Sequence, residues 1–557
     1  MKKIAIFILI MFLVGCGQGL NKPLPIVKPT NIEIFNMSDA DEVIVGGETL
    51  NLTALVYPSN AEAKVIWSSS DTSIASITQD GVVTGLQEGQ VTITAISDVD
   101  ATIYGEIKIF VYDDASNLKT IENIKVYLEE LIPSQTSENL DFVYNIDGAR
   151  LTWSTSDENT ISRTGKVKRA LKNRTVTLTC KISSSRMQGE FKKEVMVNKY
   201  ELKSRDRKLA FTYLYDYGNA FKGFNEGDLD KIDVINYSFG GIRDGKMIVG
   251  NNNFETIIKL AHDKGVRVVL AIGGWGVDGF SDAALTKESR KVFIDSIMEG
   301  IEKYRLDGID FDWEYPTSTA SGLIKARPED KVNFTLLCKE LREAMNKVNE
   351  DLILSIAVAN GAWAAQTYYE VDKLNNYIDY LHLMSYDIIN FGTQANPVIK
   401  ASHHTNLYSS SNSIGSADAG VKAYLNNGNG IDPHKIIMGI AFYGHVFKVD
   451  GSRNNGMGQN CDTSVEGNKF TVSYKKIVEE YLKEPEIYTV HKDEQAKANW
   501  IYGNNTVISY DDPYSIAEKI KYVNNQNLGG VMVWEYTKDD SQSSLINAIN
   551  DNLNIQK

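Results

Sequence analysis

Eight short apolar segments recur between residues 205 and 557, and stretches with helical periodicity separate most of them. Two of these helical stretches are ESRKVFIDSIMEGIEKY and EDKVNFTLLCKELREAMNKV. Eight alternations of strand and helix predict a (β/α)8 TIM barrel. An open doubly wound sheet is disfavoured, because no glycine-rich phosphate loop follows the first segment. The predicted strands are residues 208–215, 232–239, 266–273, 308–314, 352–358, 378–387, 435–444 and 529–535.

The interval between the seventh and eighth predicted strands is much longer than the others. Compact domains seldom contain long connections without structure of their own. We therefore expect a small inserted subdomain of mixed α and β structure at about residues 446–506.

The fourth segment carries three carboxylates at alternate positions, Asp310, Asp312 and Glu314, within the string DGIDFDWEYP. On a strand they share one face at a spacing of roughly 6.5–7 Å, and the large apolar residues between them occupy the other face. Like charges this close raise one another's pKa, so at least one acid holds a proton near neutral pH. A protonated and an ionised carboxylate together form the pair that acid-assisted bond cleavage needs. The bulk of the opposite face argues against a solvated acidic edge.

Other predicted strands also end in polar or aromatic residues. Barrel enzymes place their catalytic groups at the carboxyl ends of the strands. One such residue is more often packing than chemistry, but their recurrence on several strands of one barrel predicts an active site there. These residues are Met384, Tyr386 and Asp387 on the sixth segment, Tyr443 on the seventh and Trp534 on the eighth.

These motifs resemble the glycoside hydrolase family 18 chitinases. DGIDFDWE matches the family's DxxDxDxE signature in full, AIGGW at 271–275 resembles SxGG, and MSYD at 384–387 resembles MxYD. KIIMGIAFYGHVF and ISYDDPYSIAEKIKYVNNQNLGGVMVWEYTKDD resemble the seventh- and eighth-strand regions. The resemblance covers residues 205–550, and the long insertion resembles that of the subgroup with a deep cleft for polymer chains.

The resemblance implies retaining, substrate-assisted hydrolysis of β-1,4-linked N-acetylglucosamine polymers, chitin or chitooligosaccharides. Glu314 is then the general acid, and Asp312 orients the substrate acetamide, which is the nucleophile. Asp310 shares a proton with Asp312, Tyr386 donates a hydrogen bond to the acetamide, and Trp534 forms the floor under the sugar. The implied substrate-binding residues are Asp387, Trp275, Tyr213, Tyr443, Met384, Gly273 and Gly274.

No cofactor or metal is expected for this chemistry. The three acids on the fourth segment are possible ligands of a divalent ion. Carboxylates strung along one strand do not readily form a closed oxygen cage, however, so we disfavour a metal there.

Two positions depart from the family pattern. Ala271 stands where the family has the serine that helps hold the first inner aspartate, which puts the support of Asp310 in doubt. His445 stands where the seventh-strand signature has arginine, so contacts with the substrate are expected to differ. A loop histidine without a role is the alternative for His445.

Two other functions compete with chitin hydrolysis. An endo-β-N-acetylglucosaminidase that cuts N-glycans would share the barrel and the acids. A non-catalytic chitin-binding lectin of this family would be expected to lack the acid at position 314, which is present here. An adhesin would account for the N-terminal region but not for the row of acids.

The N-terminal region shows short alternating runs that predict two β-sandwich modules before the barrel. Residues 31–113 resemble a bacterial Ig-like domain of group 2, and residues 117–200 resemble an atypical Ig-like module that opens with a helix. Neither shows a run of aromatic residues suited to a sugar platform, so we expect both to be spacers.

The first residues resemble a bacterial lipoprotein signal, with Lys2 and Lys3 before an apolar stretch too short for a normal transmembrane helix. The string LVGC at 13–16 resembles a lipobox, so we expect residues 1–15 to be removed and Cys16 to be acylated. Residues 16–30 then form a tether that anchors the chain outside the cell. An ordinary secretion signal is the alternative.

The formal net charge of −14 argues against nucleic acid as a partner. Three cysteines remain beyond Cys16, far apart and without a CxxC motif, so neither a zinc cluster nor a disulfide framework is expected. We expect Cys180 and Cys338 to be small core residues and the protein to be a monomer.

Overall fold

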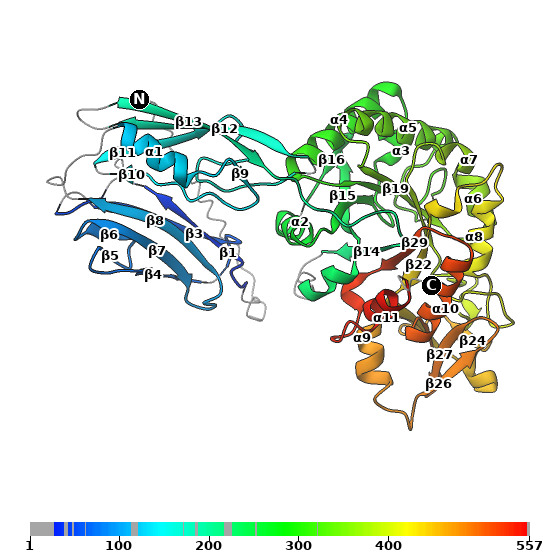
Figure 1. Ribbon diagram of the computed structural model, residues 1–557. Coiled ribbons are helices and arrows are strands. Elements are labelled where there is room, and N and C mark those ends of the chain that lie inside the picture. The colour runs from blue at the N-terminus through cyan, green and yellow to red at the C-terminus, as the bar shows by residue number, and fades with distance from the viewer. Residues whose placement is uncertain are drawn as a thin grey trace, which may run out of the picture. The chain divides into compact units, whose positions relative to one another are not determined.

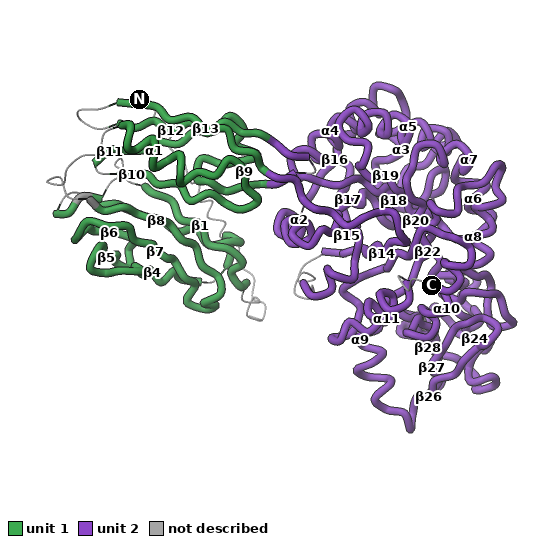
Figure 2. Tube along the Cα trace, viewed as in Figure 1, with its two compact units in different colours: residues 1–168, 175–197 green, residues 169–174, 198–557 purple. Residues whose placement is uncertain are grey.

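The computed structural model describes residues 27–37, 43–46, 49–61, 63–112, 121–146, 148–170, 172–183, 188–216, 225–250, 253–319 and 321–553. The chain divides into two compact units, residues 1–168 with 175–197 and residues 169–174 with 198–557 (Figure 2). The predicted signal segment and Cys16 lie outside the described residues. Within them, no helix is both long and apolar enough to cross a bilayer.

The first module is a sandwich of two four-stranded sheets, with strand orders β1-β3-β6-β5 and β2-β8-β7-β4. Its inward residues alternate along each strand, as in β7, where every second residue from Val91 to Ser97 is buried. Trp67 and Ile93 lie in its core. The strands are β1 (Asn31–Asn36), β2 (Val43–Ile44), β3 (Leu50–Tyr57), β4 (Val65–Ser69), β5 (Ala75–Ile77), β6 (Val82–Gly85), β7 (Gly89–Ser97) and β8 (Tyr104–Tyr112).

The second module has one five-stranded sheet, ordered β10-β11-β12-β13-β9, among its described residues. Helix α1 (Ile121–Leu131) and an irregular segment cover this sheet, so its layers differ from those of a two-sheet sandwich. Trp153 stacks on Phe142 of that segment at 4.2 Å and donates a hydrogen bond to the Val143 carbonyl. The strands are β9 (Gln135–Thr136), β10 (Asn145–Ile146), β11 (Ala149–Thr155), β12 (Arg174–Ser183) and β13 (Gln188–Val197).

Residues 198–557 contain a closed barrel of eight parallel strands (Figure 1). The first strand pairs with both the second and the last, which closes the sheet. Each strand overlaps one of the eight predicted segments, so the predicted (β/α)8 barrel is confirmed. The strands are β14 (Leu209–Tyr215), β15 (Val234–Arg243), β17 (Arg267–Gly273), β18 (Gly308–Asp312), β19 (Ile353–Ala359), β20 (Tyr380–Met384), β22 (Ile436–Ala441) and β29 (Gly530–Trp534).

Helices surround the barrel and cover the outward faces of its strands (Figure 1). Two of these helices begin with a capping box: Thr286 and Ser289 form one on α4, and Asp512 and Ser515 form one on α10. The helices are α2 (Phe254–Asp263), α3 (Phe280–Ala283), α4 (Lys287–Tyr304), α5 (Asp330–Val348), α6 (Ala362–Tyr368), α7 (Val371–Leu374), α8 (Ala417–Leu425), α10 (Pro513–Asn525) and α11 (Ser544–Leu553).

A subdomain with a five-stranded antiparallel sheet separates β22 from β29. Its first strand starts at Tyr443, directly after the seventh barrel strand, so one barrel strand leads straight into the insertion. The sheet has the order β25-β23-β28-β27-β26, and a short helix, α9 (Tyr474–Lys476), follows β25. The strands are β23 (Tyr443–Lys448), β25 (Lys469–Ser473), β26 (Thr489–Asp493), β27 (Ala498–Gly503) and β28 (Thr506–Tyr510).

Candidate active site

Strand β18 sorts its residues as the alternation predicts. Ile309, Phe311 and Trp313 belong to the apolar core shared with the surrounding helices, and Trp313 stacks on Phe280 of α3 at 5.2 Å. The intervening acids point the other way, because Asp310 contacts side chains of two other barrel strands. The apolar side chains of this segment therefore pack against the helices outside the barrel, and its carboxylates point into the barrel interior.

Asp310 is fully buried, and both of its carboxylate oxygens accept a hydrogen bond. Tyr213 of β14 donates to Oδ2 at 2.7 Å, and Ser355 of β19 donates to Oδ1 at 2.7 Å. Ala271 is the register neighbour of Asp310 on β17 and offers no donor there. Ser355 thus supplies from the other side the support that the alanine at position 271 lacks.

A buried histidine completes the surroundings of Asp310. Nδ1 of His382 on β20 lies 2.9 Å from the Tyr213 hydroxyl, 3.0 Å from Nδ2 of Asn236 and 3.6 Å from Oδ1 of Asp310. Burial lowers the pKa of His382, although the charge of Asp310 opposes this. Sequence reasoning missed Ser355, His382 and Asn236. The alternation of β20, which puts position 382 on the same face as Met384, was a signal for the histidine.

Asp312 and Glu314 are the two acids of this run whose burial is least offset by hydrogen bonds. Burial, followed by the charges of Glu314 and Asp310, raises the pKa of Asp312 well above its usual range. Burial also raises the pKa of Glu314 to about 7, the charge of Asp387 adds to this, and a hydrogen bond with Tyr315 opposes it. Oδ1 of Asp312 is buried without a hydrogen-bond partner among the described residues. The pair therefore holds a proton near neutral pH.

Aromatic residues gather around the acids at the same end of the barrel. Tyr213 and Tyr386 are buried in the inner cluster, and Trp534 and Met384 pack against it while remaining half-buried. The indole of Trp534 lies 5.7 Å from the ring of Tyr213 and stacks at 5.6 Å on Phe239, a residue that sequence reasoning missed. The half-buried indole of Trp534 offers the apolar face that a sugar ring requires.

Three of the predicted binding residues are placed differently. Trp275 is 58% exposed, and its ring lies 6.2 Å from that of Tyr315. Gly273 and Gly274 have φ of 119° and 95°, and the Gly274 amide donates to the Asp312 carbonyl at 2.8 Å. A Cβ on Gly273 would lie 2.1 Å from that carbonyl oxygen. Glycine is therefore required at both positions by the backbone, because the end of β17 passes close beside β18.

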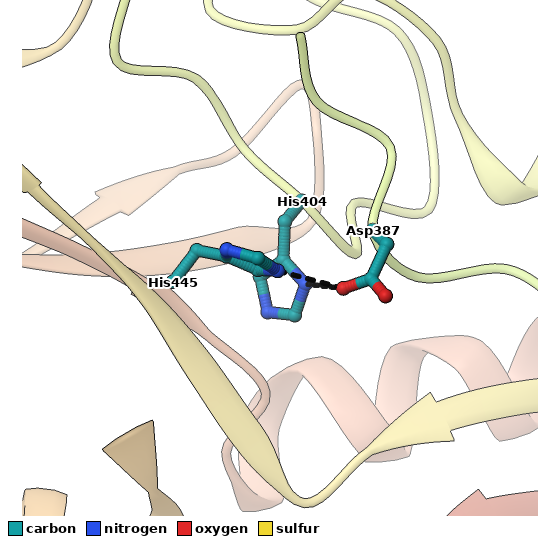
Figure 3. Close-up of side chains that lie close together, drawn as sticks. All are labelled: Asp387, His404 and His445. Atoms are coloured by element: carbon teal, nitrogen blue, oxygen red, sulfur yellow. Dashed lines mark hydrogen bonds and ion pairs between the residues drawn. The ribbon is translucent and has the colours of Figure 1, made fainter. Parts of the chain in front are cut away.

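Asp387 follows β20 and has two close hydrogen-bond donors. Tyr443 donates to its Oδ1 at 2.5 Å, and Nε2 of His445 lies 2.7 Å from the same oxygen (Figure 3). Nδ1 of His404 is 3.9 Å away. Burial by itself raises the pKa of Asp387, but the hydrogen bond and charge of His445, with His404 and Tyr443, bring it below its usual value.

The histidine at position 445 therefore contacts the predicted binding residue Asp387. His404 is fully buried, and burial followed by the charge of His445 holds its pKa well below its usual value. Sequence reasoning missed His404, which lies in an irregular segment without a strand pattern. Among the described residues, Asp387, His404 and His445 form the one group of three or more metal-ligating side chains with ligand atoms within 4.8 Å of one another.

Comparisons with known proteins agree with this architecture. Among proteins of similar sequence, chitinase A1 of Niallia circulans is 30% identical over 326 residues, covering 55% of this chain. The endochitinase of Manduca sexta is 29% identical over 355 residues, covering 59%. The chain spans only 45% and 62% of the lengths of these two relatives.

Solved structures also resemble the barrel unit, and two of them serve as examples. A glycoside hydrolase family 18 N-acetylglucosaminidase from Paenibacillus barengoltzii is 31% identical with a TM-score of 0.56, covering 62% of this chain and all of that one. Chitinase ChiW from Paenibacillus sp. str. FPU-7 is 34% identical with a TM-score of 0.57, covering 63% of this chain and 43% of that one.

Two family models match the chain. The model for bacterial Ig-like domains of group 2 matches residues 32–104. The model for glycosyl hydrolases family 18 matches residues 205–539, which contain all eight barrel strands, Asp310 and Asp312 on β18, and Glu314 just beyond it. This match covers more than half of the 557 residues, and the chain belongs to glycosyl hydrolase family 18.

Proposed function

We propose that this protein hydrolyses β-1,4-linked polymers of N-acetylglucosamine, chitin or chitooligosaccharides, with retention of configuration. The observation that carries the proposal is Glu314, a half-buried acid whose pKa is raised to about 7, two residues beyond Asp312 at the carboxyl end of the barrel. A carboxylic acid that keeps its proton near neutral pH is suited to general acid catalysis. Two proteins of similar sequence are named as chitinases, which supports the substrate class.

The reaction begins with the protonated carboxyl of Glu314. It donates its proton to the oxygen of the glycosidic bond, while the carbonyl oxygen of the substrate's own acetamide attacks the anomeric carbon. The bond between that carbon and the leaving oxygen breaks, which gives a cyclic oxazolinium and a shortened chain. Family 18 is an exception to the two-carboxylate rule for this reason, so the spacing of the acids does not predict the stereochemistry.

Asp312 supports the step by accepting a hydrogen bond from the acetamide N–H, which stabilises the positive charge that develops on this group. Asp310 lies deeper and shares its environment with Asp312, so it tunes the charge of the pair. Glu314, now ionised, then takes a proton from water. The water oxygen attacks the anomeric carbon from the face that the leaving group vacated, and the ring of the oxazolinium opens with retention.

Aromatic and polar residues around the acids hold the sugar in this scheme. The hydroxyl of Tyr386 donates to the acetamide, and Trp534 supports the apolar face of the reacting sugar. Asp387 binds a neighbouring hydroxyl group, and exposed Trp275 stacks on a sugar farther along the chain. Tyr213 was predicted to bind substrate, but its buried hydroxyl donates to Asp310, so it supports the acids from inside the barrel. Tyr443 supports Asp387 through its hydrogen bond, and Met384 lines the same end of the barrel.

A defined chitin hexamer tests this function. Purified protein is incubated with the hexamer, and products are followed by chromatography and by NMR of the anomeric proton. We expect shorter oligosaccharides, with the β-anomer appearing first. Absence of cleavage, or initial release of the α-anomer, would contradict the proposal. Release of single N-acetylglucosamine units alone would instead narrow it to the activity of the Paenibacillus barengoltzii enzyme.

We further propose that the protein is a monomeric lipoprotein held outside the cell by an acylated Cys16, with the two N-terminal modules as spacers. Several acyl chains on one residue anchor a protein stably, whereas one chain is marginal. The variant Cys16→Ala tests this in cells: the protein is expected to leave the membrane fraction. Retention of Cys16→Ala in the membrane fraction would contradict the anchor.

A further inference from the structure

Asp387, His404 and His445 converge at the carboxyl end of the barrel (Figure 3). They come from three separate segments: the residue after MSY, the irregular chain near position 404, and strand β23 of the insertion. We propose that these three side chains bind one divalent transition-metal ion, with zinc as the best fit. The inference rests on the geometry of these three side chains and not on the proposed hydrolase activity, although it shares Asp387 with the proposed sugar-binding residues. It departs from the expectation of no metal in this chain.

The ligand atoms are close to the separations that a metal imposes. Oδ1 of Asp387 lies 2.7 Å from Nε2 of His445 and 3.9 Å from Nδ1 of His404. Zinc bonds of about 2.0–2.1 Å to nitrogen and oxygen place tetrahedral ligands roughly 3.4 Å apart. One separation is shorter than this and the other longer, so a shift of the carboxylate by less than about 1 Å brings both into range. The Asp387 side chain is 44% exposed, so the shift is not blocked by packing, but it must lengthen the contact with His445.

The burial of the two rings points to a ligand at the centre of the cluster. His404 is fully buried, His445 is 3% exposed, and their rings are 4.8 Å apart. Both ring nitrogens of His404 are buried, and neither makes a well-formed hydrogen bond with the described residues, although the backbone of Tyr443 interacts with the ring. Leaving a buried polar atom without a good partner is costly, and such atoms in native structures call for an explanation. A metal ion coordinated by Nδ1 removes part of that cost.

The donor set selects the kind of metal. Two imidazoles and one carboxylate suit zinc and its neighbours in the first transition row, whereas calcium and magnesium prefer oxygen ligands alone. Three protein ligands leave the remaining position to water, reached through the exposed side of Asp387. The Tyr443 hydroxyl, which donates to Asp387, is placed as an outer-sphere donor that orients the carboxylate.

Metal titration of the intact, tag-free protein tests the site. After treatment with a chelator, zinc chloride is added in a calorimeter, and cobalt chloride is added in a parallel absorption experiment. We expect one equivalent of zinc with a Kd below about 10 µM. We also expect cobalt to produce visible d–d bands of a four- or five-coordinate site. Absence of stoichiometric zinc binding, or a cobalt spectrum of the aqueous ion alone, would overturn the proposal.

Matched histidine variants locate the binding. His404→Gln and His445→Gln are each expected to weaken zinc binding by at least about tenfold. His403→Gln is the control, because His403 is equally buried and adjacent in sequence but contacts Asp493 instead of Asp387. It should bind zinc as the wild type does. Unchanged affinity in both cluster variants would overturn the site. If His404→Gln fails to fold by circular dichroism, His445→Gln and the wild-type cobalt spectrum decide.

Discussion

Glu314 and Asp387 are carboxylates at the carboxyl ends of two strands of one barrel, yet their pKa values shift in opposite directions. Glu314 follows β18, and burial raises its pKa to about 7. Asp387 follows β20, and although burial acts on it too, its hydrogen bond with His445 and nearby positive charge bring its pKa below the usual value. The same type of residue becomes a proton donor in one place and a stable anion in the other.

The supply of hydrogen-bond donors explains the difference. Asp387 has two donors, Tyr443 and His445, within 2.7 Å, whereas Glu314 has a hydrogen bond with Tyr315 that does not offset its burial. Burial destabilises the ionised form of any carboxylate, and hydrogen-bond donors or nearby cations offset this effect. The β18 end is thus suited to proton transfer, and the β20 end to holding a ligand.

The largest effect is expected for Glu314→Gln, which removes the proton donor and keeps the shape. Turnover of the chitin hexamer should fall by about 10²–10⁴-fold, the usual contribution of general acid–base catalysis. Calorimetry should show hexamer binding largely unchanged. Turnover close to wild type would mean that the raised pKa at the β18 end has no part in catalysis.

The same variant should change stability with pH. A raised pKa means that the folded state keeps a proton that the unfolded state loses, so wild-type stability falls as pH rises from about 4.5 to 7. Glu314→Gln lacks this penalty. Its stability relative to wild type should increase across that window, by up to about 3 kcal/mol at pH 8. Urea denaturation of both proteins at pH 4.5 and pH 8 measures this stability difference. If the difference between variant and wild type is the same at both pH values, burial does not raise the pKa of Glu314.

Ser355→Ala tests whether Asp310, like Asp387, is stabilised by its hydrogen-bond donors. Loss of a hydrogen bond to a buried charge is expected to cost about 1.5–3 kcal/mol of unfolding free energy. Ala271→Ser in the Ser355→Ala background should recover part of it, because position 271 is the register neighbour of Asp310 in the barrel interior. Thermal and urea unfolding of the single and double variants measure this. A double variant no more stable than Ser355→Ala would show that the two positions do not substitute for each other.

The smallest expected effect is the influence of the Asp387 charge, at the end of β20, on the pKa of Glu314, at the end of β18. Asp387→Asn removes a negative charge that contributes to the raised pKa of Glu314. Because Glu314 acts when protonated, activity falls as pH rises through its pKa of about 7, and this basic limb should move to lower pH in the variant. The pH dependence of kcat/KM, measured with a chelator present, tests the shift. An unmoved limb would mean that the two ends are electrostatically independent.

Much of the fold follows from local periodicity. The eight apolar segments became the eight barrel strands, and the alternation along β18 correctly separated its acids from Ile309 and its apolar neighbours. These features depend on residues within a few positions of one another, which a sequence displays directly. The second N-terminal module was harder, because a helix and an irregular segment cover its sheet in place of strands.

The hydrogen-bond partners of Asp310 and Asp387 come from segments that are distant in sequence, so local periodicity does not predict them. Ser355 reaches Asp310 from a strand 45 residues away in sequence, and His404 reaches the surroundings of Asp387 from an irregular segment. Gly273 was assigned to binding, but its contact with the Asp312 carbonyl depends on where two strands pass each other. No local pattern encodes these contacts, because they form only when the barrel closes and the insertion folds beside it.

Spacing along the chain was enough to predict the type of barrel and the run of acids at 310, 312 and 314, of which the first two lie on β18. Which acid keeps a proton, which is held as an anion and which histidines contact Asp387 became clear only from the folded chain. The physical reason is that a carboxylate's charge state is set by its depth and by the donors around it, and distant segments supply both.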